Sequence, residues 1–197
     1  MPPNRVRTLS RGFFMLWPFN HLRKSRPSPR RTIEPIYGMI VAQTREPLFY
    51  RHLNVPDTVD GRFDLLILHL WLVLRRLRGV GSELSQALFD RFCDDMDDNL
   101  REMGVGDLAV PRRMQAFGEA FYGRTAAYDL AWSESEARLA EALQKNIFNG
   151  EHRDGAAGLA AYAGRVSAHL AALDDTRLLG ATWTFPPPVQ GAAGLAT

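Results

Sequence analysis

Hydrophobic residues along most of this chain recur every three or four positions, which is the spacing of one face of an α-helix. The clearest example is the segment 83–103, where aspartates occupy the opposite side. Its repeating apolar residues are Leu84, Leu88, Phe92, Met96, Leu100 and Met103. No stretch alternates apolar and polar residues between turn residues, as a half-buried strand would. The pattern predicts an all-α fold with a single compact domain.

Glycine and proline residues divide this pattern into six or seven helices. Pro47 interrupts the first apolar stripe, and Gly79, Gly81, Gly104 and Gly106 follow the last turns of two later ones. We expect Thr32 to cap the first helix and Asp107 to cap the helix after the second glycine pair. The expected ranges are about 32–46, 48–53 (a short turn or helix), 56–78, 83–103, 111–132, 136–148 and 156–173.

The segment from Leu65 to Leu74 is apolar on nearly every side and is interrupted only by His69. Ten residues are about half of the roughly 20 that a membrane-spanning helix requires. We therefore expect this segment to form the central helix of the domain. His69 is expected to be a core residue with a hydrogen-bond partner, because no second histidine stands at a metal-binding spacing.

Charge divides the chain of 197 residues into three parts. Residues 1–33 contain eight arginine or lysine residues and no acid, whereas the remainder contains 16 basic and 22 acidic residues. We expect a disordered basic arm at 1–31, a helical domain at 32–175 and an extended tail at 176–197. In this tail three consecutive prolines exclude a helix, and Trp183 and Phe185 are expected to contact the domain.

The arm carries an apolar run, Gly12 to Phe19, between arginine clusters. Three interpretations stay open: a solvated arm, a peripheral anchor on anionic lipid, and a contact with ribosomal RNA. From this arm we expect a cytoplasmic protein with peripheral contact at the inner face of the cytoplasmic membrane. The start could be Met1 or Met15. The candidate contact residues are Arg11, Phe13, Phe14, Trp17, Arg23, Lys24, Arg26, Arg30 and Arg31.

The acidic run Asp94-Asp95-Met96-Asp97-Asp98 has the DDxxD pattern of magnesium-binding helical enzymes. Such a site needs a second acidic cluster, and the chain has none. Only Asp94 and Asp98 share a helix face, which favours a solvated acidic surface. A small magnesium-dependent isoprenoid-binding protein remains as an alternative. No nucleotide-binding or nucleophile motif occurs, so we expect a protein that is not an enzyme and has no metal or cofactor.

The chain resembles the ubiquinol–cytochrome c chaperone family, in its bacterial branch, across roughly residues 32–173. Several segments carry this resemblance in order. They are Ile36-Tyr37-Gly38, Ile40-Val41-Ala42-Gln43, Arg45-Glu46-Pro47, Phe49-Tyr50, Val55-Pro56-Asp57-Thr58, Gly61-Arg62-Phe63, Asp94-Asp95-Met96-Asp97, the run 100–107 and Phe121-Tyr122-Gly123-Arg124.

The resemblance implies a helical, non-enzymatic assembly factor that holds newly made cytochrome b of respiratory complex III, together with a partner subunit. An apolar groove with an acidic rim would suit such a client. The candidate rim residues are Asp94, Asp95, Asp98 and Glu102. Tyr122 and Arg124 would contact the client or brace two corners of the chain, one at Gly104 and Gly106 and one at Gly123.

Two further expectations concern the groove and the arm. Met96, Met103, Met114 and Phe117 are expected to belong to the core rather than to a groove. The basic arm suggests another function, that of a scaffold docked on ribosomes or membranes. Nothing in the sequence points to DNA as a partner.

Overall fold

The computed structural model describes residues 28–189, which form eight α-helices and no β-strand. The all-α prediction is confirmed. Seven helices correspond to the seven expected ranges, and the eighth has five residues and begins one position before the predicted tail. The helices are α1 (Pro29–Thr44), α2 (Pro47–His52), α3 (Val59–Arg78), α4 (Ser82–Glu102), α5 (Val110–Glu134), α6 (Glu136–Ile147), α7 (Arg153–Ala172) and α8 (Asp175–Leu179).

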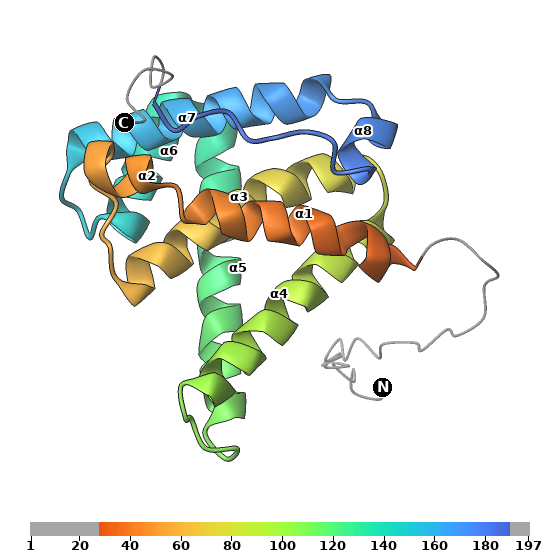
Figure 1. Cartoon of the computed structure of the whole chain (residues 1–197). Helices are drawn as coiled ribbons and strands as arrows, with labels where there is room; N and C mark the ends of the chain where they lie inside the picture. The colour runs from red at the N-terminus through yellow and green to blue at the C-terminus, as the bar shows by residue number, and fades with distance from the viewer. Residues whose placement is uncertain (1–27, 190–197) are drawn as a thin grey trace, which may run out of the picture.

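Helix α3 is the centre of the fold, as its apolar sequence predicts. Every residue from Leu65 to Leu74 is buried, because α1, α4, α5, α6 and α7 all contact this helix (Figure 1). Thr58 caps its start by accepting a hydrogen bond of 3.1 Å from the N–H of Gly61. No helix within residues 28–189 is both long enough and apolar enough to cross a membrane.

Helix α1 begins at Pro29, three residues before the cap expected at Thr32. Proline suits the first turn of a helix because it lacks only an N–H that has no partner there. Arg30 and Arg31, which the sequence assigns to the arm, therefore belong to the first turn of α1. The other predicted contact residues of the arm lie outside the described residues: Arg11, Phe13, Phe14, Trp17, Arg23, Lys24 and Arg26.

Helices α4 and α5 form a hairpin whose turn projects from the rest of the domain (Figure 1). Gly104 adopts a φ of 79° at this turn, a conformation in which glycine is favoured. Asp107 does not cap α5, because Ala109 stands at the cap position. Instead the Arg101 guanidinium joins Asp107 to Asp97, at 2.5 and 2.6 Å. This bridge ties the loop back to the last turns of α4.

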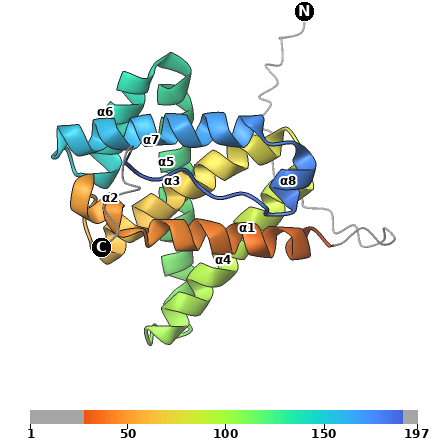
Figure 2. The same ribbon diagram turned by 45° about the horizontal axis from the view of Figure 1, so that its top comes forward.

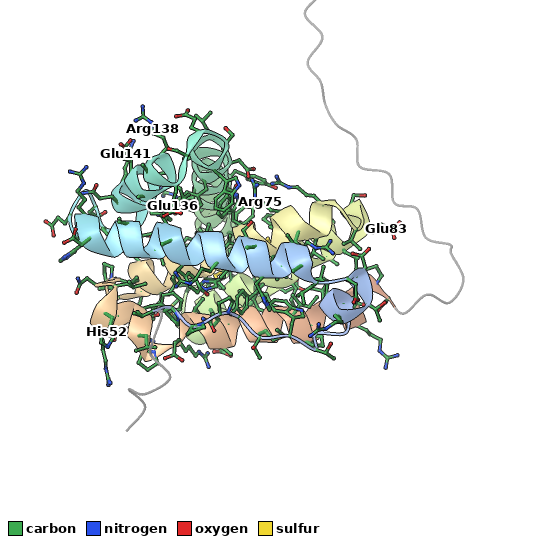
Figure 3. All side chains as sticks on the ribbon, turned by 90° about the horizontal axis from the view of Figure 1, so that it is seen from above. His52, Arg75, Glu83, Glu136, Arg138 and Glu141 are labelled. Carbon is green, nitrogen blue, oxygen red and sulfur yellow. The ribbon has the colours of Figure 1, made fainter. Side chains whose placement is uncertain are left out.

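After α8 the chain is extended and runs between α1 and α7 (Figures 2 and 3). The indole N–H of Trp183 donates to the carbonyl of Leu178 at 3.1 Å, and the Phe185 ring meets the His69 ring edge-on at 5.3 Å. Arg165 of α7 donates to the carbonyl of Pro188 at 2.8 Å. The prediction that Trp183 and Phe185 contact the domain is confirmed.

A buried polar chain joins α3, α7 and α1 beneath this segment. His69 Nδ1 lies 2.8 Å from the carbonyl of Leu65, so this nitrogen donates and Nε2 accepts from the Tyr162 hydroxyl, also at 2.8 Å. The same hydroxyl accepts from the Gln43 amide at 3.1 Å. Burial lowers the pKa of His69 to about 4, so the ring is neutral at pH 7. His69 is a core residue with partners, as predicted.

Candidate protein-binding groove

An open groove of about 290 Å³ lies where the end of α1, the start of α3, the end of α4 and the first half of α5 meet. We call it the Met103 groove. Its lining is mostly apolar at the floor, and charged or amide side chains stand around it. The lining residues are Val41, Thr44, Arg45, Val59, Asp60, Arg62, Phe63, Leu66, Asp95, Met96, Asn99, Met103 and Phe117.

Aromatic packing holds the floor of the groove in place. The rings of Phe63 on α3 and Phe117 on α5 have centroids 4.9 Å apart, and Phe63 also stacks on Phe92 of α4 at 6.3 Å. Aromatic pairs at such separations add roughly 0.5–1.5 kcal/mol each beyond the burial of their surface. Three helices are therefore fixed around one rigid apolar floor.

Two of the apolar side chains that line the groove are exposed. Val59, the first residue of α3, is 76% exposed, and Met103, directly after α4, is 63% exposed. Methionine is flexible and polarisable, so it can adapt to partner side chains of different shape. An apolar helix in the groove could contact Val59, Met103 and the aromatic floor.

Met103 corrects the expectation that it belongs to the core, because it is exposed. Met103 continues the apolar stripe of α4, in which Met96 and Leu100 are buried. The stripe is uncovered at its end, where α4 runs away from α1 towards the projecting turn (Figure 1). Phe117 is partly buried against the core and also lines the groove. Of the four predicted core residues, Met96 is buried but lines the groove, and Met114 is partly buried against the core.

The predicted acidic rim divides into an inner and an outer part. Asp95 lines the groove and faces α1, where it accepts a hydrogen bond of 2.8 Å from the Tyr37 hydroxyl. It also lies 3.5 Å from Arg91, one turn earlier on α4. The outer part is an exposed acidic strip on successive turns of α4, beside the groove. Each of its residues directly precedes a residue that lines the groove: Asp94, Asp98 and Glu102 precede Asp95, Asn99 and Met103.

Asp94 at the start of this strip pairs with Arg30 of α1 at 2.6 Å. Within residues 28–189 no three acidic, histidine or cysteine side chains are arranged as a metal site. The magnesium alternative therefore has no converging ligands in the described chain. The strip is an exposed acidic surface that could meet a basic partner.

Basic side chains complete the rim. Arg62 in the first turn of α3 pairs with Asp57 at 2.7 Å and lies over the Tyr50 ring at 5.8 Å from its centroid. Arg45 stands at the end of α1. The groove thus presents Arg45 at the end of α1 and the Arg62–Asp57 ion pair at the start of α3, whereas the acidic strip lies at the α4 side. Such an asymmetry of charge would favour one direction of a charged helical partner over the other.

Arg124 and Tyr122 have different surroundings, although they are close in the sequence. Arg124 Nη2 on α5 lies 2.8 Å from Asp64 Oδ1 on α3 and forms an ion pair with it. Arg124 therefore braces α5 against α3 instead of a glycine corner. Tyr122 is exposed and lines a second hollow with Phe89, at a ring separation of 5.6 Å.

Burial raises the pKa of Asp64 to about 6, and the nearby Arg124 guanidinium opposes this rise. The lone cysteine, Cys93, is partly buried, and burial together with Asp90 and Asp94 raises its pKa to about 11. A thiol with this pKa is protonated at pH 7 and is a weak nucleophile. Cys93 therefore adds no reactive group to the neighbourhood of the groove.

The sequence and the fold of this chain are both similar to those of known proteins. The profile of a family described as Ubiquinol-cytochrome C chaperone matches residues 51–185. A solved structure described as the Cbp3 homolog from Brucella abortus has a TM-score of 0.73 and 34% identity. The alignment covers 83% of this chain and 93% of that one.

Curated relatives are more distant. Ubiquinol-cytochrome c reductase complex assembly factor 1 of Mus musculus is 25% identical over 122 residues, which are 60% of this chain and 41% of that protein. Protein CBP3, mitochondrial, of Saccharomyces cerevisiae is 30% identical over 108 residues, which are 52% of this chain and 32% of that protein. The chain spans about half or less of the length of the curated relatives it matches.

Proposed function

This chain belongs to the ubiquinol–cytochrome C chaperone family, and from that membership we propose that it binds a newly made membrane subunit of complex III in the Met103 groove. The family consists of chaperones and assembly factors, not enzymes. The proposed client is cytochrome b, held before it is assembled. A partner subunit would share this task, and the place of action is the inner face of the cytoplasmic membrane.

The observation that carries the proposal is the exposed apolar rim over an aromatic floor. Val59 and Met103 keep most of their surface in water, although each continues an apolar stripe. A bound transmembrane segment would remove this surface from water, at about 25 cal/mol per Å² of apolar area. Helices in grooves are recognised by side chains at i, i+3, i+4 and i+7, which suits an apolar client helix.

The acidic strip supports the same client. Loops of membrane proteins on the cytoplasmic side carry an excess of lysine and arginine. A basic loop next to an apolar helix would place its charges beside Asp98 and Glu102 while the helix covers Phe117. Such complementary charges increase the association rate and select the orientation more than they increase affinity.

Site-specific photo-cross-linking in the native host tests the proposal. A photoreactive phenylalanine analogue replaces Met103 in the full chain, and the same analogue replaces Leu130 as a control, since Leu130 is 66% exposed near the other end of α5. We expect cross-linked cytochrome b from position 103 and none from position 130. Equal yields from both positions, or no cytochrome b from either, would contradict the proposal.

A binding measurement complements the cross-link. We expect Met103→Asp to weaken binding of a peptide with one transmembrane segment and the adjoining basic loop of cytochrome b by about tenfold, which equals about 1.4 kcal/mol. Leu130→Asp should leave the affinity unchanged. Circular dichroism of both variants checks that the fold is kept.

A further inference from the structure

The Met103 groove has a second candidate occupant within this chain. Residues 12–19, Gly-Phe-Phe-Met-Leu-Trp-Pro-Phe, are the most aromatic stretch of the sequence and lie outside the described residues. Basic residues flank this stretch on both sides, and residues 1–33 contain no acid. We refer to residues 12–19 as the aromatic segment.

The length of the intervening chain allows the aromatic segment to reach the groove. Helix α1 has 16 residues, so its start at Pro29 lies about 22 Å from its end, where Val41 and Thr44 line the groove. Residues 20–28 can span up to about 30 Å when extended. Nine residues are therefore sufficient to bring Phe19 to the groove.

The charges along this route are complementary. Arg30 already pairs with Asp94, the first residue of the acidic strip, at 2.6 Å. Asp98 and Glu102 follow along α4 over about 12 Å, in the direction of Met103. The last three basic residues before α1 would pass the strip on the way to the groove; they are Arg23, Lys24 and Arg26.

The chemistry of the segment also matches the groove. Phenylalanine and tryptophan side chains bury large apolar areas and pack well on other aromatic rings. The floor offers Phe63 and Phe117, and Met103 at the edge can make favourable sulfur–aromatic contacts. The basic residues on either side of the segment would remain at the acidic strip.

We propose that the aromatic segment occupies the Met103 groove when no client is present and leaves it when a client binds. This inference rests on the proposed function in one respect, namely that segment and client share the groove. A tether of nine residues gives the segment an effective concentration in the millimolar range, so weak contacts suffice. If the segment covers the groove nine-tenths of the time, the apparent client Kd rises about tenfold.

Cysteine cross-linking in the full chain tests where the segment lies. In a Cys93→Ala background, Leu16→Cys is combined with Met103→Cys or, as the reference pair, with Leu130→Cys. A short bifunctional maleimide should join residues 16 and 103 within one molecule at least fivefold more than residues 16 and 130. Adding Asp98→Lys and Glu102→Lys should remove this preference. Equal cross-linking of both pairs would overturn the inference.

A competition measurement separates this inference from the proposed function. The probe is the cytochrome b peptide with one transmembrane segment and its basic loop. Replacing Phe13, Phe14 and Trp17 by serine should increase its affinity about tenfold. An unchanged affinity overturns the inference and leaves the proposed function intact. A peptide that binds neither protein, together with a preferred cross-link between residues 16 and 103, contradicts the proposed function and supports the inference.

Discussion

The hydroxyl group of Tyr37 on α1 donates a hydrogen bond of 2.8 Å to the carboxylate of Asp95 on α4, 58 residues away in the sequence. Arg91 lies between the same two helices, 4.7 Å from the Tyr37 ring centroid and 2.9 Å from Glu34. Burial and the Asp95 carboxylate raise the pKa of Tyr37. The pair thus fixes α1 against α4 at the wall of the Met103 groove.

Removing this hydroxyl group should loosen the wall. We expect Tyr37→Phe to lower the free energy of unfolding by about 1–2 kcal/mol, because a hydrogen bond to a charged acceptor is lost. Tyr122→Phe is the matched control, since its hydroxyl belongs to an exposed side chain, and should change stability by less than about 0.5 kcal/mol. Urea denaturation measures both. Equal losses would show that the bond to Asp95 adds nothing.

His69 should make stability depend on pH. Its pKa is about 4 in the folded protein and 6.5 in the unfolded chain, so the unfolded chain binds more protons between these values. The contribution of neutral His69 to the free energy of unfolding is fully present above pH 6.5. It is lost as the pH falls towards 4, and the loss amounts to about 3 kcal/mol. His69→Phe should remove this dependence. Urea midpoints from pH 4 to 7 measure it, and an unchanged slope in the variant would contradict the assignment.

Asp64 should act in the opposite direction. Its pKa is raised from 3.8 to about 6 in the folded protein, so the folded state binds more protons between these values. Stability therefore falls as the pH rises from about 4 to 6, by about 3 kcal/mol. Because His69 opposes this trend, we expect Asp64→Asn to steepen the dependence of stability on pH. A flatter profile in Asp64→Asn would count against the raised pKa.

Arg124 is expected to matter through Asp64. Arg124→Met leaves a buried carboxylate without its ion-pair partner, and such losses are about 3–5 kcal/mol at neutral pH. The loss should shrink as the pH falls below about 6, because Asp64 becomes protonated in the folded protein and no longer needs a cationic partner. Thermal unfolding at pH 7 and pH 3.5 provides the comparison. A loss of the same size at both values would point to packing over the Phe63 ring instead of charge.

Two glycines in helices should respond oppositely to alanine. A Cβ atom at Gly61 would lie 2.1 Å from the carbonyl oxygen of Pro56, which cannot move without shifting the backbone. We expect Gly61→Ala to destabilise by about 2 kcal/mol or more. Gly38 in α1 has open space at this position, so Gly38→Ala should stabilise by about 0.5–1 kcal/mol. Melting temperatures of the two variants should move in opposite directions.

The helices were predictable because their periodicity is a local property of the sequence. The apolar segment around His69 indicates a central helix by itself, and the structure confirms this. Helix α8 was missed because it has five residues and no apolar stripe. Its cap is nevertheless visible in retrospect, since Asp174 accepts from the N–H of Arg177 at 2.8 Å.

The groove was not predictable because it depends on how helices that are distant in the sequence cross one another. Met103 carries the same sequence signal as Met96, but Met96 is buried and Met103 is exposed where α4 runs away from α1 (Figure 1). The pairing of Arg124 with Asp64 likewise joins residues 60 positions apart. No local pattern contains either relationship.

The extended segment after α8 influences the order in which this protein can fold. The contact between Gln43 and the carbonyl of Pro186 spans 143 residues. During synthesis α1 and α3 emerge early, but their faces towards this segment stay uncovered until the chain beyond Phe185 has been made. Contacts of such long range form late. During its own synthesis this protein therefore has uncovered faces on α1 and α3 until the chain has grown to about residue 186. The proposed shelter of a nascent chain thus passes through an incompletely covered state itself.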